Sequence, residues 1–289
     1  MRYRGLVIRP PSEADSYILQ VTYGCSHNAC TFCPTYKGTR FQARPLEEVR
    51  EDIAAAGRLM PLTRRVFLAD GNALCLPAGR LARILSWLRD AFPRLERAGI
   101  YANGRDINEK TRDELRQLAA LGLGIVYLGL ESGDDEVLRR VRKADGSEEM
   151  VQAVVKAREC GLRTSVIVLL GLAGKEGSLR HARLSAEAVS RMKPDYLSAL
   201  TLMVVPGTPL YAQQEKGDFT LPDQRELLQE LREFIRCCRV EGCVFRTNHA
   251  SNYLPLKGIL SRDRERLLRC IDEGIQRPQV LRPEYMRGL

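Results

Sequence analysis

The sequence predicts an α/β fold in which parallel strands alternate with helices. Short apolar runs and longer segments of helical periodicity follow one another to give six strand–helix units. The apolar runs are nearly continuous, which is typical of parallel strands covered on both faces. Alternation of this kind predicts a parallel sheet with right-handed crossovers. No stretch approaches the ~18 apolar residues of a membrane span.

Each predicted strand leads into one helix or a pair of helices. The strands are expected at residues 16–22, 65–69, 99–102, 124–130, 163–170 and 196–203. The helices are expected at residues 46–58, 78–92, 108–121, 134–142, 147–160, 179–192 and 224–239, with a last one at 262–275. Local signals set two of these boundaries, because Pro93 ends the second helix and Asn108 is the expected N-cap of the third.

The order of these units predicts the domain organisation. Residues 1–240 carry all six units and are expected to form the main domain, followed by a C-terminal cap of loop and helix at 241–289. The sequence has no internal repeat and no low-complexity segment. Its first residues lack an apolar signal core, so a cytoplasmic protein is expected.

The chain is basic, with 289 residues, a formal net charge of +9 and a pI near 9.2. This balance favours an anionic partner, either nucleic acid or a phosphorylated or carboxylated metabolite. Most basic residues stand beside acidic ones, as in residues 262–266. We therefore expect most of them to lie on solvated helix faces.

Three cysteines lie within nine residues just after the first predicted strand: Cys25, Cys30 and Cys33, spaced C-x4-C-x2-C. A disulfide framework is disfavoured because the chain has nine cysteines, an odd number. Structural zinc with His27 as the fourth ligand leaves little chain to surround a tetrahedral ion. The favoured interpretation is an iron–sulfur cluster with three thiolate ligands and one coordination position open to a reactant.

The run at residues 24–34 resembles the cluster loop of the radical S-adenosylmethionine (SAM) superfamily, with one extra residue in the first gap. The resemblance implies a partial (β/α)6 barrel of the TIM type. It also implies a 4Fe–4S cluster on Cys25, Cys30 and Cys33, with SAM bound to the open iron through its amine and carboxylate. Phe32 would pack near the adenine, and its alternative role is to tuck the loop onto the core.

Chemistry in such folds gathers at the carboxyl ends of the strands, where several polar groups follow the predicted strands. Asp70, Gly71 and Asn72 resemble the superfamily segment that approaches the SAM amine. The segment after the fourth strand resembles that of oxygen-independent coproporphyrinogen dehydrogenases and methylthiotransferases. This implies that Glu131 and Ser132 contact the ribose or the amino-acid part of SAM. The expected cofactor-binding residues are Phe32, Asp70, Gly71, Asn72, Asn103, Glu131, Ser132, Lys143 and Pro206.

Two of these residues have roles given only by the resemblance. Lys143, with Arg142 as an alternative, is the expected partner of the SAM carboxylate. Pro206 opens a Pro-Gly-Thr-Pro-Leu-Tyr turn whose backbone would pack against the adenine. The alternative for Lys143 is a solvated helix end, and for Asn103 it is an ordinary turn.

A polar and aromatic segment at residues 245–258 lies between the expected barrel and the last helix. Polar clusters in connecting loops are often sites, so this one is expected to close the open side of the barrel and hold an anionic substrate. An ordinary loop that bonds to itself is the alternative. The expected substrate-binding residues are Arg105, Arg246, His249, Asn252, Tyr253 and Lys257.

Four further cysteines lie in the C-terminal part of the chain: Cys237, Cys238, Cys243 and Cys270. Adjacent cysteines on a helix point about 100° apart, so they do not easily face one metal. Buried free thiols are favoured, and an auxiliary cluster stays open as the alternative.

The resemblance implies an enzyme that cleaves SAM reductively under anaerobic conditions. The products would be methionine and a 5′-deoxyadenosyl radical, which takes hydrogen from a substrate, and no side chain is needed as a catalytic base. A low-potential electron donor such as flavodoxin or ferredoxin is implied. A small anionic metabolite is preferred to RNA as substrate, because no appended RNA-binding module is evident. A non-catalytic iron–sulfur or zinc-binding protein is the alternative from another class.

Overall fold

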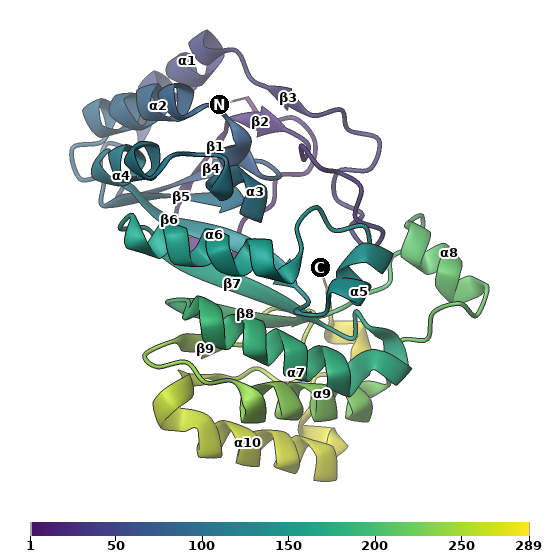
Figure 1. Cartoon of the computed structure of the whole chain (residues 1–289). Coiled ribbons are helices and arrows are strands. Elements are labelled where there is room, and N and C mark those ends of the chain that lie inside the picture. Colours follow the sequence, from purple (N-terminus) through teal and green to yellow (C-terminus); the bar gives the residue numbers. More distant parts are fainter. Residues whose placement is uncertain (1, 289) are drawn as a thin grey trace. The chain divides into compact units, whose positions relative to one another are not determined.

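A computed structural model describes residues 2–288 of the chain (Figure 1). The chain divides into two compact units. The first unit contains Met1–Asn28, Thr35–Leu128 and Gln152–Thr164, and the second contains Ala29–Pro34, Gly129–Val151 and Ser165–Leu289. The cysteine loop therefore begins in the first unit and continues in the second.

The first unit is built on parallel strands in the order β1, β4, β5, β6. Their register aligns Gln20 with Ala69 and Leu68 with Ile100, so the segments that follow β1, β4 and β5 leave the same edge. A short antiparallel hairpin of β2 and β3 flanks the cysteine loop in the sequence. The strands are β1 (Tyr17–Gln20), β2 (Thr22–Tyr23), β3 (Gln42–Ala43), β4 (Arg65–Ala69), β5 (Arg97–Ala102) and β6 (Leu123–Glu131).

Amphipathic helices with buried apolar faces accompany these strands. In α2, for example, Leu81, Ile84, Leu85 and Leu88 are buried at helical spacing. The helices are α1 (Leu46–Leu59), α2 (Ala78–Ala91), α3 (Gly104–Asn108), α4 (Arg112–Ala120) and α6 (Ser147–Glu159), with 3-10 turns at Pro11–Glu13 and Ala73–Cys75.

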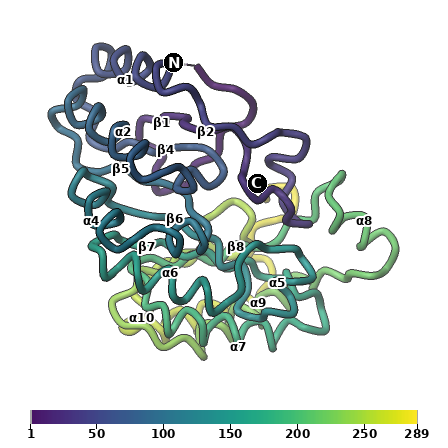
Figure 2. The backbone as a smooth tube through the Cα atoms, turned by 45° about the horizontal axis from the view of Figure 1, so that its top comes forward, coloured from purple at the N-terminus to yellow at the C-terminus, as the bar shows by residue number. Residues whose placement is uncertain are grey.

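The second unit pairs β7 with β8 and β8 with β9 in parallel, and β10 returns antiparallel to β9. Helix α9 packs between α7 and α10 (Figure 1), and Figure 2 shows the same three helices from a second direction. The elements are β7 (Arg163–Leu170), β8 (Tyr196–Thr201), β9 (Val244–Arg246), β10 (Lys257–Ile259), α5 (Asp135–Arg140), α7 (Gly174–Met192), α8 (Pro209–Glu215), α9 (Gln224–Cys237) and α10 (Leu260–Gln276). Two 3-10 turns follow, at Pro278–Val280 and Glu284–Met286.

The predicted α/β class with parallel strands is confirmed in both units. The helix predicted at residues 108–121 is instead two helices, α3 and α4. The prediction of Asn108 as its N-cap was wrong, because the cap of α4 is Thr111. Glu114 N–H donates to Thr111 Oγ1 at 3.1 Å, and the Glu114 carboxylate accepts the Thr111 N–H at 2.7 Å. This reciprocal pair is a capping box, which the Thr-x-x-Glu spacing predicts.

The C-terminal segment is more than loop and helix, since it supplies the strands β9 and β10. The division into residues 1–240 and 241–289 stays a prediction. No helix within residues 2–288 combines the length and the apolar character needed to cross a bilayer.

Candidate functional site

The start of the cysteine loop lies directly against the turn that follows β4. A Cβ atom at Gly71 would stand 2.3 Å from the Gly24 carbonyl oxygen and 2.6 Å from Cys25 Cα. Both are backbone atoms that no side-chain rotation can move, and Gly71 also has a positive φ of 34°. Only glycine permits this approach. Gly71 thus touches the backbone of the first cysteine, and its predicted approach to the SAM amine stays a prediction.

The side chain of Asn72 braces the same loop. Its Oδ1 accepts the Ser26 N–H at 2.9 Å, and its Nδ2 donates to Ser26 Oγ and to Asp106 Oδ2, each at 2.8 Å. The residue is only 2% exposed. Both amide hydrogens are therefore committed to holding Ser26, the neighbour of Cys25, against α3. A direct contact between Asn72 and SAM stays a prediction.

Asp70 is also buried and has partners that the sequence did not indicate. Its Oδ1 accepts the Tyr36 O–H at 2.6 Å, and its Oδ2 accepts from Gln20 Nε2 at 2.9 Å. The Tyr36 oxygen in turn accepts the Gly71 N–H at 3.0 Å. Burial raises the pKa of the Asp70 carboxyl, against the opposing effect of these hydrogen bonds. Tyr36 lies three residues beyond Cys33, and that proximity was the only signal for it.

Asp70 lines a cavity of about 270 Å³ together with Gly24 and two arginines, Arg4 and Arg40. Arg4 lies over the Tyr23 ring, 4.8 Å from its centroid. Neither guanidinium forms an ion pair with an acidic side chain within residues 2–288. The cavity thus places two guanidinium groups, without a carboxylate partner in the described part of the chain, near Gly24, the residue before Cys25.

Asn103 follows β5 at the same edge and has one amide group without a partner. Its backbone N–H donates to Asp106 Oδ2 at 2.8 Å. Its side-chain Nδ2 is buried and has no hydrogen-bond partner among residues 2–288. A buried donor left unpaired costs roughly 1–3 kcal/mol, so this atom suits a ligand acceptor. Arg105, in the next turn, is exposed.

The second part of the cysteine loop is anchored in the other unit. Thr31 N–H donates to the Val141 carbonyl at 2.9 Å, and its carbonyl accepts the Leu210 N–H at 3.1 Å. Phe32 packs against the apolar cluster that contains Val141 and Leu210. The alternative role of Phe32, tucking the loop onto the core, is therefore confirmed, and its contact with adenine stays a prediction. Thr31 Oγ1 is buried without a partner within the described chain.

Glu131 ends β6 in a left-handed conformation, with φ of 62°. Its side chain folds back over Gly129, where a Cβ atom would lie 2.0 Å from Glu131 Oε1. Lys143 Nζ is 3.6 Å from the same oxygen, and both side chains are largely buried. Burial raises the pKa of Glu131, and the positive charge of Lys143 opposes that rise. Lys143 thus has a carboxylate partner within the protein.

The other predicted cofactor residues differ in exposure. Ser132 is fully buried, and its Oγ accepts the Asp134 N–H at 3.0 Å. Pro206 is exposed in the loop before α8, whose N-cap Thr208 accepts the Tyr211 N–H at 3.2 Å.

Two predicted substrate residues of the C-terminal loop have hydrogen-bond partners elsewhere in the chain, and their contact with a substrate stays a prediction. Asn252 accepts from Thr201 Oγ1 and donates to the Ala199 carbonyl, each at 2.9 Å. The Tyr253 hydroxyl donates to Glu284 at 2.6 Å, and the Arg287 guanidinium lies 4.0 Å from its ring centroid. Among the others, Lys257 is exposed, and Arg246 has a buried Nε without a partner in residues 2–288.

His249 is half-buried and has a lowered pKa, because burial and then the charge of Arg282 disfavour the imidazolium. Its Nδ1 accepts the Ser251 N–H at 3.1 Å, which leaves Nε2 as the protonated nitrogen of a neutral ring. His249 therefore contributes a neutral imidazole to this loop near pH 7.

Acidification is expected to destabilise the fold through His249. The pKa of such a histidine is lower in the folded state than the value of about 6.5 in the unfolded state. Its contribution to the free energy of unfolding is therefore complete above about pH 6.5 and is lost as the pH falls toward the pKa of the folded state. The thermal unfolding temperature of the wild type should therefore fall more between pH 7.5 and pH 5 than that of His249→Gln. Equal slopes for the two proteins would contradict this expectation.

The structure does not gather a preformed metal site. Within residues 2–288, no group of three or more His, Cys, Asp or Glu side chains could hold a metal ion, in the cysteine loop or near Cys238. Cys25, Cys30 and Cys33 are half-buried and form no disulfide within residues 2–288. Ligands of this kind assemble around the metal when it binds. Three thiolates are the donors that an iron–sulfur cluster requires. The unpaired Nδ2 of Asn103 follows β5, the strand next but one to β1, and could donate to a ligand bound to that cluster.

The four C-terminal cysteines form no disulfide within residues 2–288; Cys238 and Cys243 are buried, and Cys237 and Cys270 are half-buried. Burial raises the pKa of Cys238 to about 12, so its thiol is protonated at neutral pH. This favours the interpretation of Cys238 as a buried thiol. An auxiliary cluster stays untested.

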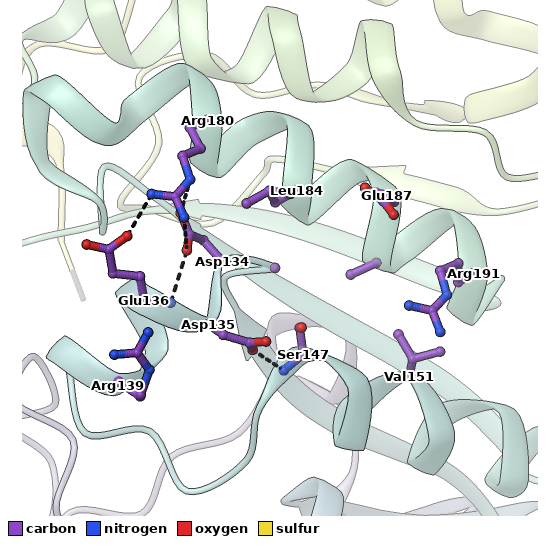
Figure 3. Close-up of a pocket in the computed structure, with 12 residues that line it drawn as sticks. Asp134, Asp135, Glu136, Arg139, Ser147, Val151, Arg180, Leu184, Glu187 and Arg191 are labelled. Atoms are coloured by element: carbon purple, nitrogen blue, oxygen red, sulfur yellow. Dashed lines mark hydrogen bonds and ion pairs between the residues drawn. The ribbon is translucent and has the colours of Figure 1, made fainter.

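A second cavity, of about 350 Å³, lies in the second unit among α5, α6 and α7 (Figure 3). Arg180 reaches across it to Asp134 at 3.2 Å and to Glu136 at 2.7 Å. Asp135 accepts the Ser147 N–H at 2.7 Å and so caps α6. None of the predicted site residues lines this cavity, but Asp134 belongs to the loop that carries Glu131.

These features define an α/β protein with a cysteine loop at the carboxyl edge of parallel strands. The radical SAM superfamily model matches residues 19–177, more than half of the chain, and the chain therefore belongs to the radical SAM superfamily. Enzymes of this superfamily use a 4Fe–4S cluster and SAM, as the sequence predicted.

Two curated relatives and one solved structure agree with this assignment. The heme chaperone HemW of Bacillus subtilis is 21% identical over 211 residues, which cover 70% of this chain and 54% of that protein. The oxygen-independent coproporphyrinogen III oxidase of Escherichia coli is 25% identical over 245 residues, which cover 83% of this chain and 52% of that protein. The chain thus spans about half the length of these relatives.

The solved structure of coproporphyrinogen III oxidase (HemN) from Escherichia coli, described as a radical SAM enzyme, shares the fold. The TM-score is 0.60 at 22% identity, with 76% of this chain and 51% of that chain covered. A similarity at this level supports the architecture and leaves the substrate open.

Proposed function

We propose that Cys25, Cys30 and Cys33 hold a 4Fe–4S cluster whose remaining iron binds SAM. When bound, this pair supplies reductive cleavage of SAM to methionine and a 5′-deoxyadenosyl radical, which takes hydrogen from a substrate. The observation that carries the proposal is the backbone contact of Gly71 with Cys25. It joins the cysteine loop to the strand-end turn that the superfamily uses at the SAM amine.

The chain's own residues bind and orient in this proposal, and none acts as a catalytic base. Asn72 holds the loop through Ser26. Asn103 offers its unpaired Nδ2 to an acceptor of the cofactor, which would satisfy a buried donor. Glu131, held by Lys143, contacts the ribose or the amino-acid part of SAM.

We further propose a small anionic substrate and a low-potential electron donor such as flavodoxin or ferredoxin. The uncommitted guanidinium groups of Arg4 and Arg40 and the unpartnered Nε of Arg246 support an anion. The donor is part of the proposal because the cleavage of SAM consumes one electron.

Cluster ligation is tested by anaerobic reconstitution with iron and sulfide. Wild type and Cys160→Ala should each retain close to four irons and four sulfides per chain, whereas Cys30→Ala should lose most of both. Cys160 is the control, since it is a buried cysteine outside the cysteine loop and outside the C-terminal group. Iron retention by Cys30→Ala equal to that of Cys160→Ala would refute the assignment of ligands.

A further inference from the structure

The second unit contains a buried histidine–glutamate pair that the proposed chemistry does not use. His181 on α7 and Glu230 on α9 are both fully buried. His181 Nδ1 lies 3.0 Å from Glu230 Oε1, and His181 Nε2 lies 3.2 Å from the backbone carbonyl oxygen of Glu131. The chain has only three histidines, and this one is tied directly to the predicted SAM-contacting residue.

The hydrogen-bond directions follow from the partners. A carbonyl oxygen only accepts, so His181 Nε2 carries the hydrogen that it donates to Glu131. Glu230 Oε1 also accepts the Gly171 N–H at 2.8 Å, and its Oε2 accepts from the Ser178 hydroxyl. The resulting chain of contacts links the residue after β7 to the last residue of β6 through two side chains.

Helix α7 holds the same β6–α5 loop at three further points. The Gly133 N–H donates to Ser185 Oγ at 2.8 Å, and Arg180 pairs with Asp134 at 3.2 Å (Figure 3). A Cβ atom at Gly133 would lie 2.2 Å from the Leu184 carbonyl oxygen, so the loop backbone rests on the helix. These contacts hold the loop from Glu131 to Asp134 in one position against α7.

The backbone of Glu131 needs such support. A glutamate with φ of 62° occupies a region that residues other than glycine rarely adopt. Conformations of this kind persist where the surroundings over-determine them. The bond from His181 fixes the peptide plane that follows Glu131, and Gly129 leaves room for the side chain to fold back toward Lys143.

We propose that His181 is a positioning residue for SAM binding: through the Glu131 carbonyl, it holds the backbone that aims the Glu131 carboxylate at the cofactor. Glu230 keeps the imidazole in place from the opposite side. The inference rests on the proposed function for the contact between Glu131 and SAM. It adds His181 on α7 and Glu230 on α9 to the residues that control the affinity for the cofactor.

The first test does not require any cofactor. Hydrogen–deuterium exchange of the wild type, His181→Ala and His181→Gln should reveal faster exchange at residues 130–136 in the alanine variant. Glutamine can still donate to the Glu131 carbonyl, so it should restore most of the protection. Unchanged exchange in this segment of a folded His181→Ala protein would overturn the proposal, whether or not SAM binds.

The second test is a double-mutant comparison on the reconstituted protein. His181→Ala and Glu131→Ala should each retain the iron of the wild type and weaken the affinity for SAM by about tenfold or more. The double variant should bind no more weakly than Glu131→Ala, because His181 acts through Glu131. Additive losses, or wild-type affinity in His181→Ala, would overturn it, whereas failure of the wild type to bind iron or SAM would refute the proposed function instead.

If His181→Ala does not fold, Glu230→Gln carries the same test, with His181→Gln beside it as the variant that keeps the donor. Glu230→Gln can still accept the Gly171 N–H while it changes the partner of His181 Nδ1. We expect intermediate SAM affinity for Glu230→Gln and near wild-type affinity for His181→Gln. An affinity equal to that of the wild type in Glu230→Gln, with faster exchange at residues 130–136, would contradict the link from this backbone to the cofactor.

Discussion

Replacing Gly71 with alanine is expected to abolish retention of the iron–sulfur cluster. The new Cβ would lie 2.3 Å from the Gly24 oxygen and 2.6 Å from Cys25 Cα, which is far inside van der Waals contact. The conflict is with backbone atoms, so it is relieved only by displacing the first cysteine or the β4 turn. Overpacking of this kind costs roughly 1–3 kcal/mol, and here the strain falls on a proposed ligand.

The measurement is iron and sulfide content after anaerobic reconstitution, together with thermal unfolding of the protein without cluster. Gly79→Ala is the matched control, because a Cβ at Gly79 meets nothing within 4 Å and the residue lies in helix α2. The control should retain wild-type iron and gain up to about 1 kcal/mol of stability from helix propensity. Wild-type iron content in Gly71→Ala would contradict the account of this contact.

Replacing Asn72 with aspartate is expected to destabilise the fold strongly, although the two side chains have nearly the same shape. Asn72 Nδ2 donates to Asp106 Oδ2 at 2.8 Å in a buried environment. An aspartate would place a second carboxylate oxygen at that distance, and the Lys110 ammonium, 3.4 Å from the Asp106 carbonyl oxygen, offsets only part of the repulsion. An uncompensated buried charge costs about 3–5 kcal/mol, and a partly compensated one costs less.

Chemical denaturation at pH 8 and pH 5 measures this effect. Repulsion raises the pKa of the carboxyl pair, so the missing stability should return in part as the pH falls and one carboxyl gains a proton. Asn248→Asp makes the same chemical change at an exposed position and should leave stability within about 0.5 kcal/mol of the wild type. Equal stability of Asn72→Asp and Asn248→Asp at pH 8 would show that the hydrogen bond from Asn72 to Asp106 does not stabilise the fold.

The sequence predicted most strands because their apolar runs are continuous and bounded by polar residues. The strands at residues 65–69 and 163–170 match β4 and β7 to the residue. In contrast, β9 and β10 have three residues each and lie in a polar segment, so no periodicity could reveal them. Short strands of this kind are defined by their neighbours in the sheet.

The sequence proposes which segments form the candidate site, but it does not reveal the contacts among them. The spacing of Cys25, Cys30 and Cys33 and the turn after β4 follow from sequence order. The commitment of Asn72 to Ser26 and Asp106 does not, because these partners lie 46 and 34 residues away. The His181–Glu230 pair spans 49 residues for the same reason.

Polar composition proved ambiguous in the C-terminal loop. Asn252 and Tyr253 were predicted to bind a substrate because they are polar and lie in a connecting segment. Their side chains are hydrogen-bonded to Thr201, Ala199 and Glu284, and their contact with a substrate stays a prediction. A loop whose polar groups bond within the protein has the same composition as one that binds a substrate, so composition alone does not distinguish them.

The most direct test of the central claim is whether this chain cleaves SAM. The protein is reconstituted anaerobically with iron and sulfide, supplied with dithionite and SAM, and assayed for 5′-deoxyadenosine beside Cys30→Ala. We predict product from the wild type and none above background from Cys30→Ala. No product from either protein, with zinc in place of iron by metal analysis, would contradict the account and indicate a structural metal-binding role.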